Sequence, residues 1–251
     1  MSDTQTLIEN RPPSVAGLFL ERVAATPDAE AYRYPVPSSA DQGPDEWKSL
    51  SWAQAAERVY AIAAGLIELG AQPEQRVALA AGTRIEWILA DLGIMCAGAA
   101  TTTVYPQTNA DESAYILSDS ESRVLIAENA EQLAKVKEKR AELPELTHVV
   151  VIDAAGVETA DWILTLDELE KRGAARLEKD PELIKERVGA ITKDQLATLI
   201  YTSGTTGRPK GVRLPHDNWS YMRRRSPRPG WSAPRTCSTS GCRSRTSSAR
   251  C

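Results

Sequence analysis

Residues 1–222 alternate short apolar runs with longer segments in which apolar residues recur at helical spacing. Short runs rich in β-branched residues predict strands buried on both faces. Strands that alternate with helices at this spacing predict an α/β fold, with a mostly parallel sheet and flanking helices. The predicted strands are RVALAA (76–81), ATTTVY (100–105), RVLIAE (123–128), HVVVID (148–153) and LATLIYT (196–202).

Four predicted helices begin with a capping signal, in which Ser, Thr or Asn is followed three residues later by Glu or Gln. Gly70 and Gly173 stand where two of these helices are expected to stop. The capping pairs are Ser51 with Gln54, Thr83 with Glu86, Asn109 with Glu112, and Thr165 with Glu168.

Two further segments are assigned from composition. Residues 31–52 predict two strand ends around a loop rich in Pro and Gly. Residues 154–195 are acidic and helical with weak amphipathicity, so we expect an insertion or connector carried on the surface.

The overall composition indicates a soluble intracellular protein. Of the 251 residues, 42% are apolar and 25% are charged, close to the globular average. The N-terminus has no basic region followed by an apolar one, so no secretory signal is expected. The longest uncharged stretch, 92–110, is rich in Thr and Gly and contains Pro106, which makes it a poor membrane span.

The composition changes abruptly after Met222. Residues 223–251 contain eight Arg, seven Ser and three of the four Cys, but no Asp, Glu, Lys, Leu, Ile or Val. Subtracting those eight positive charges from the net charge of −4 leaves −12 on residues 1–222. A segment without such apolar residues cannot offset its own ordering entropy, so we expect a folded body at 1–222 and a disordered basic tail at 223–251.

Two interpretations of this tail are open. One is a basic arm that binds nucleic acid or anionic lipid. The other is a reading-frame error near Met222, which we favour. Codon degeneracy allows a frame in which each codon takes the third base of one tail codon and the first two bases of the next. That frame can encode AAVAETGMVSAADVQYLWLPLSHVFGKV, with a helix-like start, a turn and an apolar strand.

The chemistry is concentrated directly after the last predicted strand. There the chain reads Thr202-Ser203-Gly204-Thr205-Thr206-Gly207, followed by Arg208-Pro209-Lys210. Glycine allows close approach of the backbone to a ligand and positive φ. Backbone N–H groups beside hydroxyls form a nest for phosphate oxygens, and Lys210 adds a mobile positive charge. These residues predict a phosphate-binding loop.

A surface turn rich in Ser, Thr and Gly is the ordinary alternative. The position directly after a buried strand favours a ligand loop, because α/β proteins place such loops there. The loop is not a Walker A motif, since no Gly-Lys-Ser/Thr follows its glycines, and Gly204, Gly207 and Gly211 do not fit GxGxxG.

The stretch YTSGTTGRPKGV resembles the phosphate-binding signature of the adenylate-forming superfamily, which includes acyl-CoA synthetases, luciferases and nonribosomal-peptide adenylation domains. The resemblance covers most of 1–222 and is strongest to long-chain fatty acyl-CoA ligases. It implies that the body is an incomplete N-terminal AMP-binding domain of the adenylate-forming fold. The family has an LPLxH motif further on, and the shifted frame supplies LPLSHVFG. The segments that carry the resemblance include FLERVAATPDAEAY, LSWAQAAERVYAIAAGLIELG and TTTVYPQTNADESAYILSDSESRVLIAE.

The resemblance implies a two-step reaction. A fatty carboxylate attacks the α-phosphate of Mg-ATP to give acyl-AMP and pyrophosphate, and the thiol of CoA then displaces AMP. The implied cofactors and partners are ATP, Mg²⁺, CoA and a fatty acid, with no specific nucleic acid and no assigned Mg²⁺ ligand. The loop would bind the β- and γ-phosphates and stabilise the departing pyrophosphate. Its implied contacts are Thr202, Ser203, Gly204, Thr205, Thr206, Gly207 and Lys210.

Other functions remain open beside this one. An aryl- or medium-chain acyl-CoA ligase is one alternative, and a non-catalytic phosphate- or nucleic-acid-binding protein with a basic tail is another. The family's Mg²⁺-binding Glu, ribose-binding Asp and lid domain would lie downstream. We therefore expect no catalytic residue, no ligase activity and weak ATP binding in these 251 residues. The resemblance implies a cytoplasmic protein, with peripheral membrane contact in the full-length form.

Four other features of the body are assigned structural roles. His148 starts a predicted strand without triad partners, and His216 follows the loop, where we expect a supporting role rather than catalysis. Cys96 lies among apolar residues and is expected to be inert, and a body with one cysteine suits a reducing compartment. The run KVKEKR at 135–140 is expected to be a solvated helix face.

Overall fold

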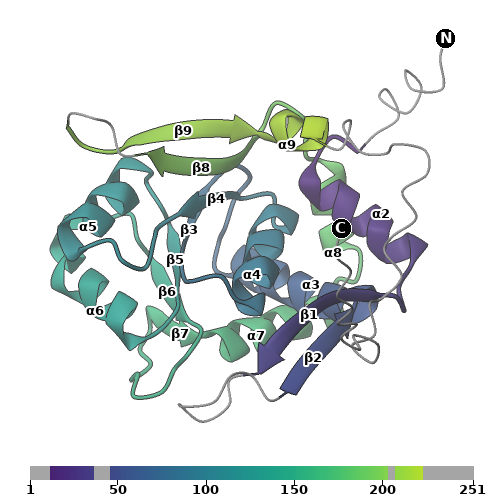
Figure 1. The fold of residues 1–251 in the computed structure, drawn as a ribbon, viewed down its shortest axis with the longest axis horizontal. Coiled ribbons are helices and arrows are strands. Elements are labelled where there is room, and N and C mark those ends of the chain that lie inside the picture. Colours follow the sequence, from purple (N-terminus) through teal and green to yellow (C-terminus); the bar gives the residue numbers. More distant parts are fainter. Residues whose placement is uncertain (1–11, 37–45, 203–206, 223–251) are drawn as a thin grey trace, which may run out of the picture.

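The computed structural model describes residues 12–36, 46–202 and 207–222, which are built around a seven-stranded sheet (Figure 1). The strand order is β7-β6-β5-β3-β4-β8-β9, and all neighbours are parallel except β9, which runs antiparallel to β8. The predicted α/β fold with a mostly parallel sheet is therefore confirmed. The strands are β3 (Arg76–Ala80), β4 (Ala100–Thr103), β5 (Val124–Ala127), β6 (His148–Val151), β7 (Ile163–Thr165), β8 (Leu196–Thr202) and β9 (Lys210–Pro215).

Helices cover both faces of this sheet (Figure 1). Alternate residues of β3 face opposite ways, so Val77 and Leu79 contact the larger apolar core and Ala78 and Ala80 contact the smaller one. Two-sided burial explains why these strands are continuously apolar in sequence. The larger core packs α2 (Val15–Ala25), α3 (Trp52–Glu68), α4 (Ile85–Cys96), α7 (Leu166–Lys179) and α8 (Leu183–Gly189), and the smaller core packs α5 (Ala110–Asp119) and α6 (Ala130–Glu138).

A second, two-stranded sheet lies beside α2 and α3. Strands β1 (Glu30–Val36) and β2 (Glu46–Ser51) pair antiparallel, which confirms the two strand ends predicted within 31–52. Three aromatic rings join this sheet to the helices, with ring centroids 6.1 Å apart for Phe19 and Trp52 and 5.8 Å apart for Tyr32 and Trp52.

The predicted helix starts are confirmed at three positions. Ser51 and Thr165 form complete capping boxes, and the Asn109 side chain accepts a hydrogen bond from the Glu112 backbone N–H. These side chains satisfy backbone donors that the first helical turn leaves without partners.

The predicted cap at Thr83 is wrong. Helix α4 begins one residue later than expected, with Arg84 in the cap position and no side-chain cap. The Arg84 guanidinium holds Glu86 at 2.6 Å and Asp153 at 2.6 Å. Glu86 is therefore engaged in an ion pair and does not complete a capping box with Thr83.

The two glycines predicted to stop helices behave differently. Gly70 follows the end of α3 with φ +92°, which confirms the predicted stop. The predicted stop at Gly173 is wrong, because α7 continues to Lys179. A Cβ atom at Gly173 would lie 1.8 Å from the carbonyl oxygen of Ala61, so glycine here permits α7 to cross α3 in backbone contact.

The expectation that residues 154–195 form a surface connector is also wrong. This segment supplies the edge strand β7 and the helices α7 and α8. Leu169, Ile184 and Val188 are buried in the larger core, and Glu170 pairs with Arg58 of α3 at 2.8 Å. The segment is polar on average, but the close crossing at Gly173 lets a narrow apolar stripe suffice for burial.

The run KVKEKR is less solvated than expected. The Lys135 side chain is 16% exposed, and its ammonium donates a hydrogen bond to the Pro106 carbonyl at 2.7 Å. The Lys139 side chain is 20% exposed and pairs with Asp111 of α5. These two lysines tie α6 to its neighbours, because their long aliphatic stems pack against protein.

The predicted tail at 223–251 lies outside the described residues.

A short 3₁₀ turn (Arg140–Glu142) follows α6, and α9 (His216–Met222) follows β9. Within the described ranges, no helix is both long and apolar enough to cross a membrane.

Candidate functional site

The predicted phosphate loop connects β8 to β9, the antiparallel pair at one edge of the sheet. Six of the seven residues of β8 are at least partly buried, and Thr202 at its carboxyl end is exposed. Thr202 pairs with Lys210, the first residue of β9, so the two ends of the loop lie side by side. Of the predicted contacts, Thr202, Gly207 and Lys210 are placed here. The remaining four, Ser203, Gly204, Thr205 and Thr206, lie outside the described residues.

Gly207 shows why this loop contains glycine. Its φ is +105°, a backbone conformation that residues with a Cβ atom rarely adopt. Gly207 is exposed, and no heavy atom lies within 4 Å of the position a Cβ atom would take. Backbone conformation, rather than crowding, therefore selects glycine at this position.

Lys210 supplies an exposed positive charge at the exit of the loop. Among the described residues, it belongs to none of the ion pairs. In an antiparallel pair, directly opposite side chains lie on one face, with Cβ atoms about 5 Å apart. The ammonium of Lys210 and the hydroxyl of Thr202 can therefore contact the same anion.

Tyr115 of α5 contacts the exit of the loop. Its hydroxyl donates a hydrogen bond to the Pro209 carbonyl at 3.1 Å, and the Arg208 guanidinium lies 5.0 Å from the centre of its ring. Sequence reasoning missed Tyr115, because Pro209 is 94 residues away and nothing in the helix around Tyr115 indicates this contact.

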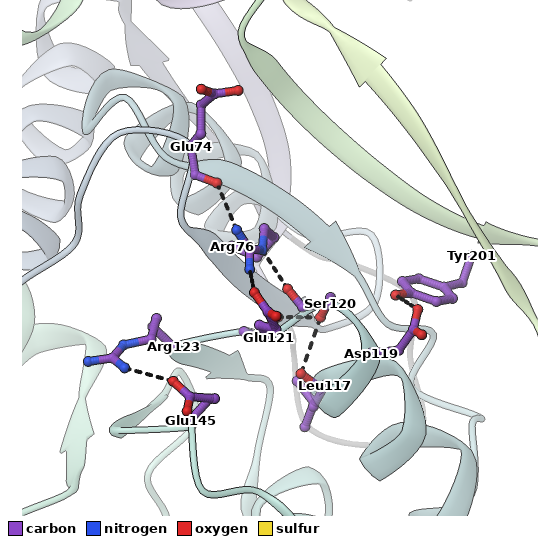
Figure 2. A network of polar contacts seen from close by, with 10 residues as sticks. Glu74, Arg76, Leu117, Asp119, Ser120, Glu121, Arg123, Glu145 and Tyr201 are labelled. Atoms are coloured by element: carbon purple, nitrogen blue, oxygen red, sulfur yellow. Dashed lines mark hydrogen bonds and ion pairs between the residues drawn. The ribbon is translucent and has the colours of Figure 1, made fainter.

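Tyr201, next to the end of β8, is fixed from two sides. Its hydroxyl donates to Asp119 at 2.6 Å (Figure 2), and its ring meets that of Tyr115 edge to face, with centroids 6.4 Å apart. Burial and the Asp119 carboxylate together raise the pKa of Tyr201 well above its usual range. Gly211 pairs with Tyr201 across the ladder, and a Cβ atom there would lie 3.2 Å from the ring.

The end of α5 is tied to the start of β3. The Arg76 guanidinium donates to the Ser120 carbonyl and pairs with Glu121, as Figure 2 shows. The Glu74 carbonyl also accepts a hydrogen bond from Arg76. The helix that carries Tyr115 and Asp119 is thus attached to a central strand of the sheet.

The acidic side chains after β5 and β6 are engaged with one arginine. Arg84 lies 2.6 Å from Asp153 and 3.6 Å from Glu128, and Glu128 also accepts the Gly82 backbone N–H. The hydrogen bond to Asp153, followed by that to Glu86, raises the pKa of Arg84 further above its usual range. Opposite charges are paired at these strand ends, whereas the described part of the β8–β9 loop keeps an unpaired cation.

His216 is buried beyond the far end of β9. Neither of its ring nitrogens has a hydrogen-bond partner among the described residues, and burial lowers its pKa to about 4. Its backbone N–H bonds the Gln195 carbonyl, next to the start of β8 rather than near the loop. This placement gives His216 no proton-transfer geometry, and its supporting role stays a prediction.

Among the described residues, neither Cys96 nor His148 lies in a catalytic or metal-binding cluster. Cys96 is fully buried, and burial raises the pKa of its thiol strongly, which suits an inert core residue. The His148 ring lies 3.0 Å from the Thr147 hydroxyl, and partial burial lowers its pKa.

Within the described residues, no group of three or more His, Cys, Asp or Glu side chains could hold a metal ion. A magnesium ion carried by nucleotide phosphates does not need such a group, because it takes most of its ligands from phosphate and water. The described ends of the loop fit that mode, because Thr202 places an exposed hydroxyl at one end and Gly207 an exposed backbone at the other.

A separate groove of about 500 Å³ lies between α2, β1, α3 and α4. Its lining includes Phe19, Tyr32, Trp52 and Arg22, and none of the described residues of the β8–β9 loop. It is therefore distinct from the candidate phosphate site.

The chain is similar to known proteins over most of its length. The AMP-binding enzyme family matches residues 19–239. The long-chain-fatty-acid–CoA ligase FadD15 of Mycobacterium bovis is 35% identical over 205 residues, covering 82% of this chain and 32% of that protein. The long-chain-fatty-acid–CoA ligase ACSBG2 of Xenopus laevis is 32% identical over 209 residues, covering 82% and 27%. The chain thus spans about a third of the length of these relatives.

Solved structures share the same fold. The anthranilate CoA ligase AuaEII in complex with anthranoyl-AMP aligns with a TM-score of 0.62 at 24% identity, over 85% of this chain and 37% of that one. The A-PCP didomain of a carboxylic acid reductase from Segniliparus rugosus, in complex with AMP, aligns with a TM-score of 0.66 at 20% identity, over 83% and 32%.

Proposed function

Since the chain belongs to the AMP-binding enzyme family, we propose that it is the phosphate-binding N-terminal part of an ATP-dependent ligase. This ligase would convert long-chain fatty acids first to acyl-AMP and then to acyl-CoA. The observation that carries this proposal is the pairing of Thr202 with Lys210 around a glycine-containing loop, with the lysine exposed and unpaired among the described residues.

The chemistry explains why such a loop is needed. A carboxylate is a poor acyl donor until it is joined to a phosphate, and this step releases pyrophosphate. Negative charge therefore builds up on the departing phosphates. Lys210 and the hydroxyl of Thr202 would stabilise that charge, together with Ser203, Gly204, Thr205, Thr206 and Gly207. Magnesium bound to the phosphates would neutralise part of the same charge.

The substrate class is proposed from the relatives. The two relatives at 35% and 32% identity are both long-chain-fatty-acid–CoA ligases. An aryl- or medium-chain acid is the alternative, which the fold shared with an anthranilate CoA ligase keeps open. Fatty acid, ATP and CoA are thus the proposed substrates.

We further propose that residues 1–222 are the folded part of an N-terminal AMP-binding domain and that residues 223–251 are read out of frame. The nucleotide sequence around codon 222 tests this directly. A single-base shift that restores AAVAETGMVSAADVQYLWLPLSHVFGKV supports the proposal. A gene in which no such shift yields this peptide contradicts it.

Phosphate binding is tested on the chain itself. Magnesium pyrophosphate titrated into the protein and followed by ³¹P NMR should bind weakly, on the order of millimolar. Lys210→Ala should abolish this binding. Lys193→Ala is the matched control, because Lys193 is an exposed lysine just before the other end of β8. Binding that is absent, or unaffected by Lys210→Ala, would contradict the assignment.

The substrate class is tested on the product of the corrected frame. With ATP and CoA, it should form acyl-CoA faster from palmitate than from octanoate or benzoate. Faster turnover of benzoate would favour the aryl-acid alternative.

A further inference from the structure

Lys210 follows two residues that are held by the same side chain. Tyr115 accepts the Arg208 guanidinium over its ring and donates its hydroxyl to the Pro209 carbonyl. These contacts fix consecutive residues directly before the lysine that is proposed to bind phosphate. The exposed arginine is thereby drawn toward α5, while the lysine is left unpaired among the described residues.

The hydrogen bond from Tyr115 to the Pro209 carbonyl restricts the backbone just before Lys210. Proline has no backbone N–H, so residue 209 cannot donate a hydrogen bond to a neighbouring strand. Its ring also fixes φ near −65°, which leaves ψ as the main free rotation before Lys210. The direction of the Pro209 carbonyl is set by this ψ angle. A hydrogen bond from Tyr115 to this carbonyl therefore restricts the direction in which the chain enters Lys210.

Tyr115 is itself held in place. Its ring packs edge to face on Tyr201, and Tyr201 bonds Asp119, which lies one helical turn after Tyr115 in α5. Figure 2 shows this bond, together with the Arg76 contacts that fasten the end of α5 to the sheet. The anchor is therefore rigid, because both the helix and the ring are fixed independently of the loop.

We propose that Tyr115 is a positioning residue of the phosphate loop, whose ring and hydroxyl hold Arg208 and Pro209 so that Lys210 meets the anion in a fixed place. The proposal rests on the proposed function of the loop and adds to it a residue 94 positions before Pro209. Tyr115 does not touch the anion. It lowers the entropy that the loop loses when the anion binds.

The test compares Tyr115→Phe with the unchanged chain. The substitution keeps the ring under Arg208 and removes only the hydroxyl. A hydrogen bond of ordinary strength predicts a loss of roughly twofold to tenfold in magnesium pyrophosphate affinity by ³¹P NMR titration. Tyr115→Leu, which also removes the ring, should weaken affinity further. Tyr105→Phe is the matched control, because Tyr105 is 64% exposed.

A second measurement follows the loop without the ligand. Trypsin cuts after Lys210, and the cut between Lys210 and Gly211 should become faster in Tyr115→Phe while cleavage at exposed lysines elsewhere stays the same. This readout separates a local release of the loop from a general loss of stability, which would accelerate all sites.

The outcomes separate the two proposals. If Lys210→Ala abolishes binding while Tyr115→Phe leaves affinity and the Lys210 cut unchanged, the positioning role is overturned and the phosphate site stands. If Tyr115→Phe weakens affinity and speeds the cut, the positioning role is supported. If the unchanged chain binds no pyrophosphate, the proposed function fails, and the role of Tyr115 in anion binding is overturned with it. A faster cut after Lys210 in Tyr115→Phe would then show only that Tyr115 anchors the loop.

Discussion

Thr202, the last residue of β8, pairs across the antiparallel ladder with Lys210, the first residue of β9. The pairing places a hydroxyl and an ammonium on the same face of the hairpin. The pairing brings the two ends of the loop side by side, which is the geometry that the proposed phosphate site requires.

Removing the hydroxyl should weaken anion binding less than removing the ammonium. Thr202→Val keeps the shape and β-propensity of the residue, so we expect a threefold to tenfold loss of pyrophosphate affinity, about the size of one hydrogen bond to an anion. ³¹P NMR titration measures it, with Thr192→Val, an exposed threonine before β8, as control. Affinity equal to that of the unchanged chain would show that Thr202 is only a strand residue.

The helix crossing at Gly173 should be sensitive to a single methyl group. A Cβ atom there would lie 1.8 Å from the Ala61 carbonyl oxygen and 2.7 Å from the Gly65 nitrogen, and both are backbone atoms that cannot turn away. We expect Gly173→Ala to lower the free energy of unfolding by about 3 kcal/mol or more, measured by urea denaturation.

Gly189→Ala is the matched control for that substitution. Gly189 also lies in a helix, but no heavy atom stands within 4 Å of its Cβ position. Alanine there should leave stability unchanged or raise it by up to about 1 kcal/mol. Equal losses in the two variants would mean that the crossing of α3 and α7 is not the cause.

The two threonines predicted to cap helices should respond differently to alanine. Thr165 accepts the Glu168 N–H at 3.1 Å, so Thr165→Ala should cost about 1 kcal/mol. Thr83 is exposed and forms no side-chain cap, so Thr83→Ala should change stability by less than about 0.5 kcal/mol. Urea denaturation of both variants checks this, and a larger loss at Thr83 would restore the cap predicted from the sequence.

His216 should make the folded chain sensitive to acid. Burial lowers its pKa to about 4, while an imidazole in the unfolded chain titrates near 6.5. The buried, neutral His216 contributes fully to the free energy of unfolding above pH 6.5. This contribution is lost as pH falls toward 4, because the unfolded chain then binds a proton that the folded chain does not. The loss is roughly 2 kcal/mol between pH 7.5 and 4.5.

The measurement compares urea denaturation of the unchanged chain and of His216→Leu at both pH values. The comparison is needed because burial raises the pKa of Asp91 to about 6, which stabilises the folded chain as pH falls and partly hides the histidine. The difference between the two proteins removes the Asp91 contribution. Parallel stability profiles would show that His216 does not titrate as proposed.

Local signals predicted most of the fold. The five central strands, the caps at Ser51 and Thr165 and the stop at Gly70 depend on neighbours within a few residues, so the sequence shows them directly. Gly173 was misread because its function depends on a helix more than a hundred residues earlier. The cap at Thr83 fails because Glu86 pairs with Arg84, which Asp153, two residues after β6, holds in turn.

The candidate site likewise contains residues that the sequence indicates locally and residues that only the fold brings to it. Gly207, with its positive φ, and the exposed Lys210 belong to a contiguous motif that the sequence shows directly. Their contact with phosphate stays a prediction. Tyr115 contacts the loop exit from α5, Asp119 bonds Tyr201, and Arg76 ties the end of α5 to β3. No periodicity or spacing marks them, because their contacts depend on the order of the strands.

The first strand of the large sheet to be made, β3, lies in its interior, between β4 and β5. During translation β4 and β5 can dock on its two sides as soon as they leave the ribosome, and β6 and β7 then lengthen one side. The outer edge of β4 stays bare until Leu196 begins β8, because α5, α6, α7 and α8 are all synthesised in between. A bare strand edge is a template for pairing with other chains. We therefore expect nascent chains halted in this interval to aggregate more readily than chains that already contain β8.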